Sequence, residues 1–255
     1  MISSALVGSS NPWAISTSPY LNYGQEMRQI TSFPSLVLHL EEANGSYAKS
    51  SLEAYFFRHA FTGSSFESIY DKKLNEFTEK DIVAVSMLSV NIPPSATRWI
   101  LGEGRTQLSD LLKKIDPNIA IEDQNANLTR DNTAWNLWKA IHSRRGIGET
   151  MASKLLAAKR PALFPIYDQH VAKALQLSQD RYWQPWQDFM RGEDGKKAKR
   201  IVTELAQELG KQDLSTLRLL DIVIWMQQHG HKFITEKLVK EGSMVPVNYA
   251  APLEF

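Results

Sequence analysis

A short turn between two helical patterns, Gly146-Ile147-Gly148, constrains the fold of this chain more than any other feature of its sequence. Glycine reaches positive φ angles cheaply, and without a Cβ it lets another group approach the backbone closely. Residues 133–143 before the turn and residues 149–159 after it both carry apolar side chains at helical spacing. The stretch therefore predicts a helix, a tight turn and a second helix.

Such a turn also predicts a place where an anion could bind. Backbone N–H groups at the start of a helix lack partners within the helix, and the helix dipole favours negative charge there. From Lys139 to Arg160 the chain has six basic residues and one acidic residue, a local charge of +5 on a chain of net charge +1. This contrast favours a phosphodiester partner.

Two runs of residues carry a resemblance to a known superfamily. GIGETMASKLL, residues 146–156, resembles the hairpin of the helix-hairpin-helix DNA glycosylases, in particular the endonuclease III and adenine glycosylase-like branch. PIYDQHVAKAL, residues 165–175, resembles the segment after that hairpin, where an aspartate opens the next helix. Asp168 follows Gly146 by 22 positions, about the separation that the superfamily uses. The flanking runs DIVAVSMLSVNIP and LRLLDIVIWM resemble an uncharacterised bacterial protein family, which implies no function.

The glycosylase resemblance implies roles for individual positions. Asp168 would be the catalytic carboxylate, and the hairpin would hold a phosphate of duplex DNA, often with a bound monovalent cation; no other cofactor is implied. Thr150 stands where bifunctional members keep a Schiff-base lysine, and because threonine cannot form an imine, no lyase chemistry is expected there. Lys154, one turn further on, is expected to point elsewhere. The implied phosphate contacts are the residues in and around the turn: Arg144, Arg145, Gly146, Ile147, Gly148 and Thr150.

The chemistry that this resemblance implies is hydrolysis of an N-glycosidic bond. Such an enzyme grips the backbone, flips a nucleotide out of the stack and stabilises an oxocarbenium-like sugar while water attacks. An aspartate at a helix start is held in its ionised form by backbone N–H groups and the helix dipole, as that role requires. The alternative for Asp168 is a simple helix cap. The alternative for the protein is a non-catalytic DNA-binding or structural protein that keeps only the scaffold.

Aromatic and basic residues after this region allow two interpretations. Tyr182, Trp183 and Trp186 could stack on bases, or they could pack a corner of the fold. Residues 191–200 hold five basic and two acidic residues, which suits either a phosphate-contacting patch or a solvated helix start. Both interpretations stay open on the sequence alone.

Helical patterns fill nearly the whole chain, and no convincing strand alternation interrupts them. The predicted fold is all-α, a two-lobed helical fold containing a helix-hairpin-helix motif. Arg218 and Asp221, three residues apart on one helix, are expected to pair. Residues 116–132 are polar and predict a linker. The predicted division is an irregular N-terminal extension 1–45, a lobe 46–122, a lobe 123–242 with the hairpin and Asp168, and a tail 243–255; the lobes could equally form one compact domain.

Several classes of site and protein are excluded by composition. The chain has no cysteine, which excludes disulfides, iron–sulfur clusters and cysteine-ligated zinc. His229 and His231 have no third ligand nearby, so no metal site is predicted. No apolar run approaches the ~20 residues of a membrane span. No signal peptide is recognised, and a cytoplasmic location is expected.

Overall fold

The computed structural model describes residues 28–57, 61–71 and 74–230, and every regular element in these ranges is helical. The predicted all-α class is therefore confirmed. Residues 1–27, the tail 243–255 and His231 lie outside the described ranges. In chain order the elements are α1 (Phe33–Glu41), η1 (Glu42–Gly45), α2 (Ser46–Phe57), η2 (Thr62–Ser65), α3 (Phe66–Ile69), α4 (Glu79–Ser86), α5 (Pro94–Leu101), α6 (Arg105–Lys113), α7 (Thr133–His142), α8 (Glu149–Lys159), α9 (Gln169–Ala174), η3 (Gln179–Arg181), α10 (Trp183–Arg191), α11 (Glu193–Glu208), α12 (Thr216–Trp225) and η4 (Met226–Gly230).

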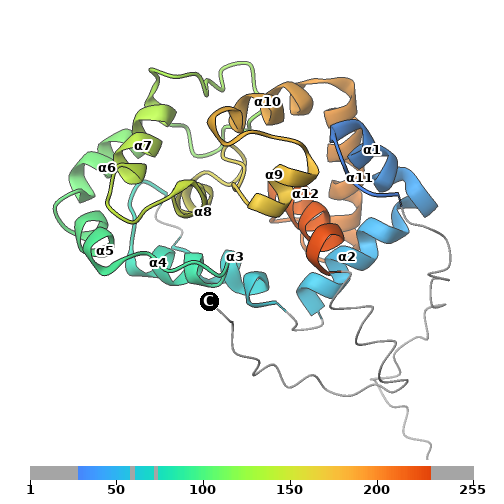
Figure 1. The fold of residues 1–255 in the computed structure, drawn as a ribbon, viewed down its shortest axis with the longest axis horizontal. Helices are drawn as coiled ribbons and strands as arrows, with labels where there is room; N and C mark the ends of the chain where they lie inside the picture. The colour runs from blue at the N-terminus through green and yellow to red at the C-terminus, as the bar shows by residue number, and fades with distance from the viewer. Residues whose placement is uncertain (1–27, 58–60, 72–73, 231–255) are drawn as a thin grey trace, which may run out of the picture.

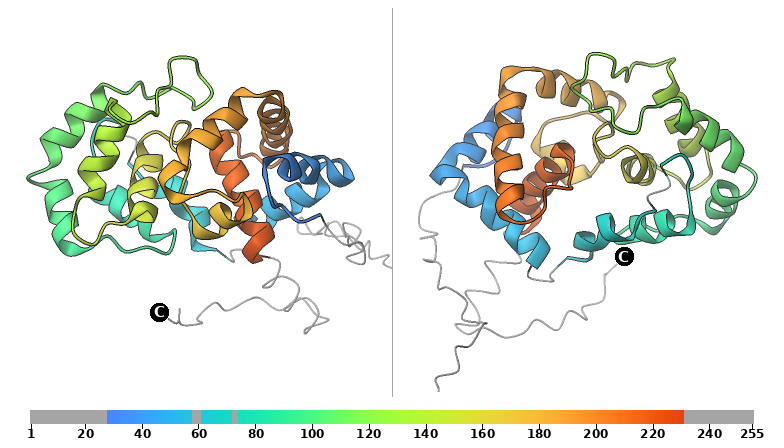
Figure 2. Two further views of the ribbon diagram at one scale, coloured as in Figure 1. Left: turned by 45° about the horizontal axis from the view of Figure 1, so that its top comes forward. Right: turned by 180° about the vertical axis from the view of Figure 1, so that it is seen from behind.

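Helix α8 runs through the middle of the molecule. Figure 1 shows α4 to α7 on one side of it and α1, α2 and α10 to α12 on the other, and the view from behind in Figure 2 agrees. Residues 152–159 of α8 are all buried, so neighbours enclose this helix on every side. Helices α4 and α7 pack directly against it. The residues at the two ends of α8 are thus positioned by the packing of this helix against its neighbours.

The first two α-helices pack against the last two. Helix α1 lies against α11 and α2 against α12, and the Phe33 ring stacks on Phe189 with centroids 4.4 Å apart. Leu36 and Leu40 of α1 have no exposed surface. Within the predicted irregular extension 1–45, a short helix or strand is expected around Leu36 to Leu40, and α1 is that helix; its apolar face lies in the core and not on a surface. The contact of α2 with α12 also joins helices from both sides of the predicted lobe boundary.

A buried ion pair fastens α4 to the end of α8. Thr78 and Asp81 form a capping box that starts α4, as the three-residue spacing predicts. The same carboxylate lies 2.5 Å from Nζ of Lys159, and both side chains have no exposed surface. Burial raises the pKa of Asp81, and the hydrogen bond and charge of Lys159 lower it. Lys159, one of the six basic residues counted around the hairpin, is thus structural.

The segment from 116 to 132 is irregular but firmly docked. The Ile121 N–H donates to the Ala162 carbonyl at 2.8 Å. Nε2 of Gln187, on α10, donates to the carbonyls of Ile121 and Ala126, both at 3.0 Å. Ile121 and Ala126 are themselves buried. This segment is therefore part of the core, and the prediction of a linker between lobes is wrong here because its few apolar residues anchor it.

Candidate functional site

The predicted turn forms between α7 and α8. Across the turn the Ile147 N–H donates to the Arg144 carbonyl at 2.9 Å, and the Ile147 side chain is buried. Gly146 has a φ of +85°, a left-handed conformation that costs other L-residues free energy. A Cβ on Gly146 would also lie 2.9 Å from Cγ of Pro93. The fold alone thus explains a glycine at position 146.

Gly148 has no such structural explanation. Its φ of −95° and ψ of 179° suit any residue, and a Cβ there would meet nothing within 4 Å. It stands at the N-cap position of α8, where no side chain caps the free N–H groups of the first turn. The residue is exposed, and Thr150 beside it is partly exposed. Open space beside uncapped amides is the geometry that close approach of an anion requires.

These two glycines give a direct prediction about stability. Gly146→Ala should lower the free energy of unfolding by about 2 kcal/mol, because alanine is strained at positive φ and meets Pro93. Gly148→Ala should lower it by less than about 1 kcal/mol, the cost of alanine at an N-cap. Urea unfolding followed by circular dichroism measures both. Equal losses in the two variants would contradict the structural difference drawn between them.

Two arginines beside the turn keep their charge available. Among the described residues, neither Arg144 nor Arg145 has a carboxylate within 4.0 Å. The Arg144 guanidinium lies over the Trp99 ring, 4.1 Å from its centroid, so a planar cation is held in place next to the turn. Arg145 is exposed. The one local acid, Glu149, lies 3.2 Å from Nε2 of His142.

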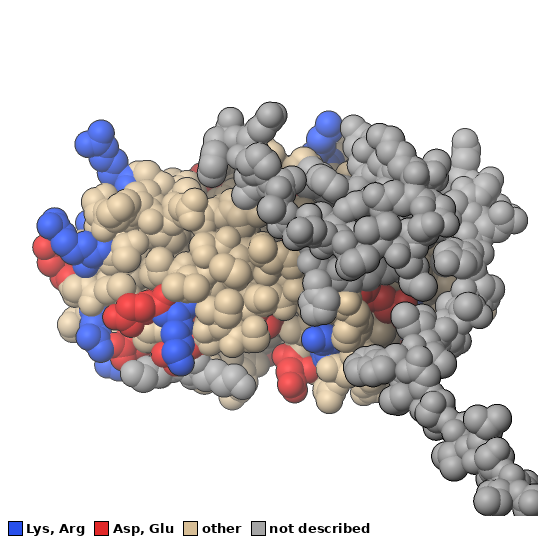
Figure 3. Space-filling model, turned by 90° about the horizontal axis from the view of Figure 1, so that it is seen from below, with Lys and Arg blue, Asp and Glu red and all other residues tan. Residues whose placement is uncertain are grey.

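The local charge is smaller on the surface than in the sequence. Of the six basic residues counted there, Lys154, Lys159 and Arg160 are buried and contact protein groups. They cannot neutralise phosphates, so the expected charge of +5 does not face the solvent. Figure 3 shows acidic and basic side chains interspersed on one face of the molecule. A phosphate site would therefore depend on the turn and its two arginines, and not on a broad basic surface.

Asp168 occupies the helix start that its sequence context predicts. It is the N-cap residue of α9, and its Oδ1 accepts a hydrogen bond from the His170 N–H at 2.8 Å. The residue as a whole is half-buried. The Tyr167 N–H donates to Oγ of Ser153 at 2.9 Å, which ties the residue before Asp168 to α8. The hairpin and the acid thus belong to one hydrogen-bonded unit.

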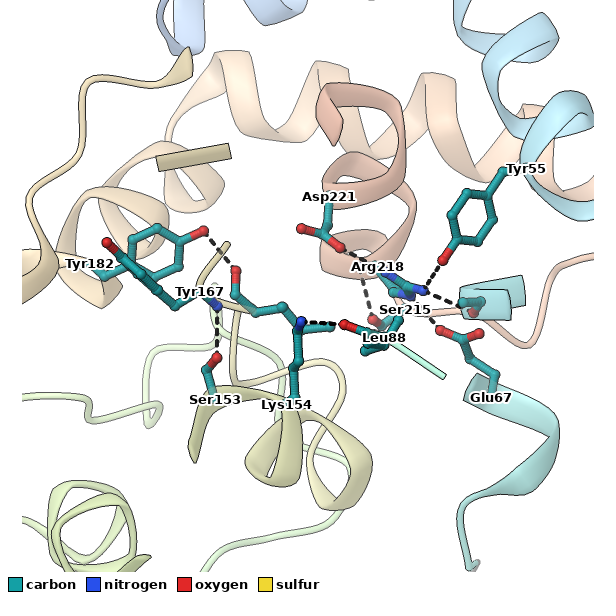
Figure 4. Close-up of polar contacts among 12 residues, drawn as sticks. Tyr55, Glu67, Leu88, Ser153, Lys154, Tyr167, Tyr182, Ser215, Arg218 and Asp221 are labelled. Carbon is teal, nitrogen blue, oxygen red and sulfur yellow. Dashed lines mark hydrogen bonds and ion pairs between the residues drawn. The ribbon is translucent and has the colours of Figure 1, made fainter. Parts of the chain in front are cut away.

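Lys154 is buried, and its Nζ donates to the Leu88 carbonyl at 2.7 Å (Figure 4). Its charge interacts with those of Asp168 and Asp221. Burial lowers the pKa of Lys154 to about 8, and the two carboxylates partly offset that shift. Because Nζ is occupied by the Leu88 carbonyl, the expectation that Lys154 points elsewhere than Thr150 stays a prediction.

Asp221, on α12, is a second acid whose charge interacts with those of Asp168 and Lys154. The predicted pair forms: Nη1 of Arg218 lies 2.7 Å from Oδ2 of Asp221. Burial raises the pKa of Asp221 to about 6, the Arg218 charge lowers it, and the Asp168 charge raises it. The charges of Lys154 and Asp221 thus both act on Asp168, one attractively and one repulsively.

The three aromatic residues proposed for base stacking belong to the core. Tyr182, Trp183 and Trp186 are at most 9% exposed, and the Tyr182 hydroxyl donates to the Ile166 carbonyl at 2.7 Å. Their rings pack on other aromatic rings, among them Tyr167 and Phe33. The packed corner is thus the correct alternative, and we do not retain a stacking role. The burial of these rings depends on partners far away in the sequence, such as Phe33 for Trp186, so the residues around them do not indicate it.

No metal centre accompanies these residues. Within the described ranges, no group of three or more histidine, aspartate or glutamate side chains is arranged to hold a metal ion. The monovalent cation implied for the hairpin would depend on backbone carbonyls, and it stays a prediction. Neither the pocket at Phe66 and Asp221 nor the groove at Glu122 and Lys199 is lined by Asp168. No helix in the described part of the chain is long and apolar enough to cross a membrane.

Comparison with known proteins assigns the chain to a family. The model of a family of unknown function, DUF6308, matches residues 48–228, which include α2 to α12 and both flanking runs noted in the sequence. Because the match covers more than half of the chain, the protein belongs to this family. No curated protein and no solved structure matches the chain.

Proposed function

We propose that this member of the DUF6308 family binds duplex DNA through the α7–α8 turn and acts as a monofunctional DNA glycosylase with Asp168 as its catalytic carboxylate. The observation that supports the DNA contact is Gly148: it leaves open space at an uncapped helix start, although the backbone conformation there does not require glycine. Arg144 and Arg145, which pair with no carboxylate in the described part of the chain, supply positive charge on the residues before it. These features fit a phosphate held by backbone amides and flanking guanidinium groups.

The support for catalysis is the connection between that turn and the acid. Ser153 joins α8 to the residue before Asp168, so a strand held at the turn would be held relative to the carboxylate. One oxygen of Asp168 caps α9, which keeps the group in place. The other oxygen could then stabilise positive charge developing on a sugar. Thr150 offers no amine, and Nζ of Lys154 is engaged by a carbonyl, so hydrolysis without lyase chemistry is proposed.

A non-catalytic DNA-binding protein is the second candidate. It is favoured by one observation, that Asp168 already serves as a helix cap and lines neither of the cavities described above. Both candidates predict DNA binding, but only the glycosylase would release a free base from the DNA.

The DNA contact is tested by Gly148→Val. We expect binding to weaken about tenfold on every duplex sequence alike, because the added side chain blocks a phosphate contact that carries no sequence information. Arg145→Ala should reduce the slope of log affinity against log salt concentration by about 1. Fluorescence anisotropy at several salt concentrations measures both effects.

Lys49→Ala is the control for the loss of an exposed basic side chain, since Lys49 lies on α2, a helix on the other side of α8 from α7 (Figure 1). It should leave affinity and salt slope close to those of the unaltered protein. Unchanged binding by Gly148→Val, with the variant folded, would remove the phosphate contact from the proposal.

A further inference from the structure

Four planar side chains form a continuous stack along α7, the helix that packs against α6 and α8 (Figure 1). The Arg130 guanidinium lies over the Trp135 ring, 5.3 Å from its centroid. Trp135 stacks on Trp138 with centroids 4.7 Å apart, and Trp138 stacks on His142 at 4.2 Å. The three rings follow one another at the three- and four-residue spacing that shares one helix face, and all three residues are partly exposed. The stack is therefore accessible along this face of α7.

The core covers one edge of this stack but not its end. Trp183 of α10 is nearly perpendicular to both indoles, with centroids 5.9 Å from Trp135 and 6.4 Å from Trp138. Because these two distances are nearly equal, Trp183 lies against the edges of both rings and not on the outer face of Trp135. The group that does lie over that outer face is Arg130, an exposed side chain.

Arg130 is a cover that a ligand could displace. In the described part of the chain no carboxylate lies within 4.0 Å of it. Its distance of 5.3 Å from the Trp135 centroid is also longer than the 4.1 Å between Arg144 and Trp99. Another planar group can thus take its place on Trp135 while the guanidinium moves to the outer side of that group.

Unpaired cations continue from this stack toward the turn. Lys139 and Arg145 are exposed, and among the described residues neither has a carboxylate within 4.0 Å. Residues 130–149 carry four basic and two acidic side chains, and one of these acids, Glu149, already contacts His142. Aromatic faces bordered by positive charge are the combination that binds single-stranded nucleic acid through its bases and its phosphates.

We propose that the outer face of Trp135 binds one unpaired base of a nucleic-acid strand, held between the indole and the Arg130 guanidinium. A base has the flat face on which both groups stack, and Lys139 and Arg145 supply charge for the adjoining phosphates. Because every base has such a face, the contact carries little sequence preference. It concerns an unpaired strand, whereas the function proposed above concerns a duplex held at the turn, and it does not depend on Asp168.

Oligothymidylate and an abasic oligonucleotide of the same length form a matched pair of probes, since they carry the same phosphates and differ in their bases. We expect the full-length protein to bind oligothymidylate at least about tenfold more tightly, the effect of one stacked base. This preference should disappear in Trp135→Leu, persist in Trp135→Phe, which keeps an aromatic face, and fall about threefold in Arg130→Ala. Fluorescence anisotropy of the labelled strands measures all four proteins. Lys49→Ala is the control for loss of an exposed cation and should keep the full preference.

Equal affinity of the unaltered protein for the two strands overturns the proposal, as does an unchanged preference in both Trp135→Leu and Arg130→Ala. If Trp135→Leu does not fold, the unaltered protein and Arg130→Ala, a change at an exposed residue, still decide. Gly148→Val should weaken duplex binding and leave the preference for bases intact, so failure of the turn contact and failure of this stacking site give different results. Oligouridylate and oligodeoxyuridylate, which differ only in their sugar, then separate the two sources of the base: tighter binding of the first indicates RNA, and of the second DNA.

Discussion

Replacing Asp168 with asparagine should lower the rate of free-base release from damaged duplex DNA by about 100-fold or more. Asparagine removes the negative charge that would stabilise an oxocarbenium-like sugar. It keeps a side-chain oxygen that can cap α9, so the free energy of unfolding should change by less than about 0.5 kcal/mol. The measurement is chromatography of released bases from a panel of duplexes carrying different lesions and modified bases.

Asp180→Asn provides the matched control, because Asp180 is an exposed aspartate with only a distant contact to Arg181. It should release base at the rate of the unaltered protein. Base release that is unaffected by Asp168→Asn would remove this residue from catalysis. Release by no duplex at all, with salt-dependent binding retained, would instead support the non-catalytic alternative.

Replacing Arg160 with alanine should cost about 4 kcal/mol or more of stability and could prevent folding. Arg160 has no exposed surface, and its guanidinium donates to the carbonyls of Leu74, Leu112 and Ile115. Alanine would leave these buried acceptors without donors, at about 1–3 kcal/mol each, and would open a cavity. Urea unfolding at equilibrium measures the loss.

Two variants make this result specific. Arg160→Lys should recover little, because one ammonium group cannot replace a planar fork that bonds several carbonyls at once. Arg145→Ala, at an exposed arginine on the neighbouring turn, should change stability by less than about 0.5 kcal/mol. Similar unfolding midpoints for Arg160→Ala and Arg145→Ala would contradict a structural role for the buried arginine.

The two predictions separate charges that look equivalent in the sequence. Arg145 and Arg160 belong to the same basic stretch, yet one is exposed and unpaired while the other joins α8 to the segments before α4 and after α6. A count of charges along the sequence does not distinguish these two arginines. The proposed DNA contact consequently depends on fewer cations than the sequence suggested, and its salt dependence should be correspondingly modest.

Local features were well predicted. Helix α8 spans Glu149–Lys159 as its apolar spacing indicates, Thr78 and Asp81 form their capping box, and Arg218 pairs with Asp221. Each of these depends on residues within a few positions of one another, so the sequence pattern contains the whole interaction. The Asp168 cap belongs to the same class.

Packing between distant segments decided the rest. It placed α1 in the core, buried Trp186, and turned Lys154 and Arg160 inward, none of which helical periodicity distinguishes. It also brought Lys154 and Asp221 beside Asp168. The sequence by itself therefore determined the helices, the turn and the caps, because hydrogen bonds and side-chain spacing within a helix are local. Only the tertiary structure determined which charges face solvent and which lie near each other, because burial depends on partners far along the chain, such as Leu88, which is 66 residues from Lys154.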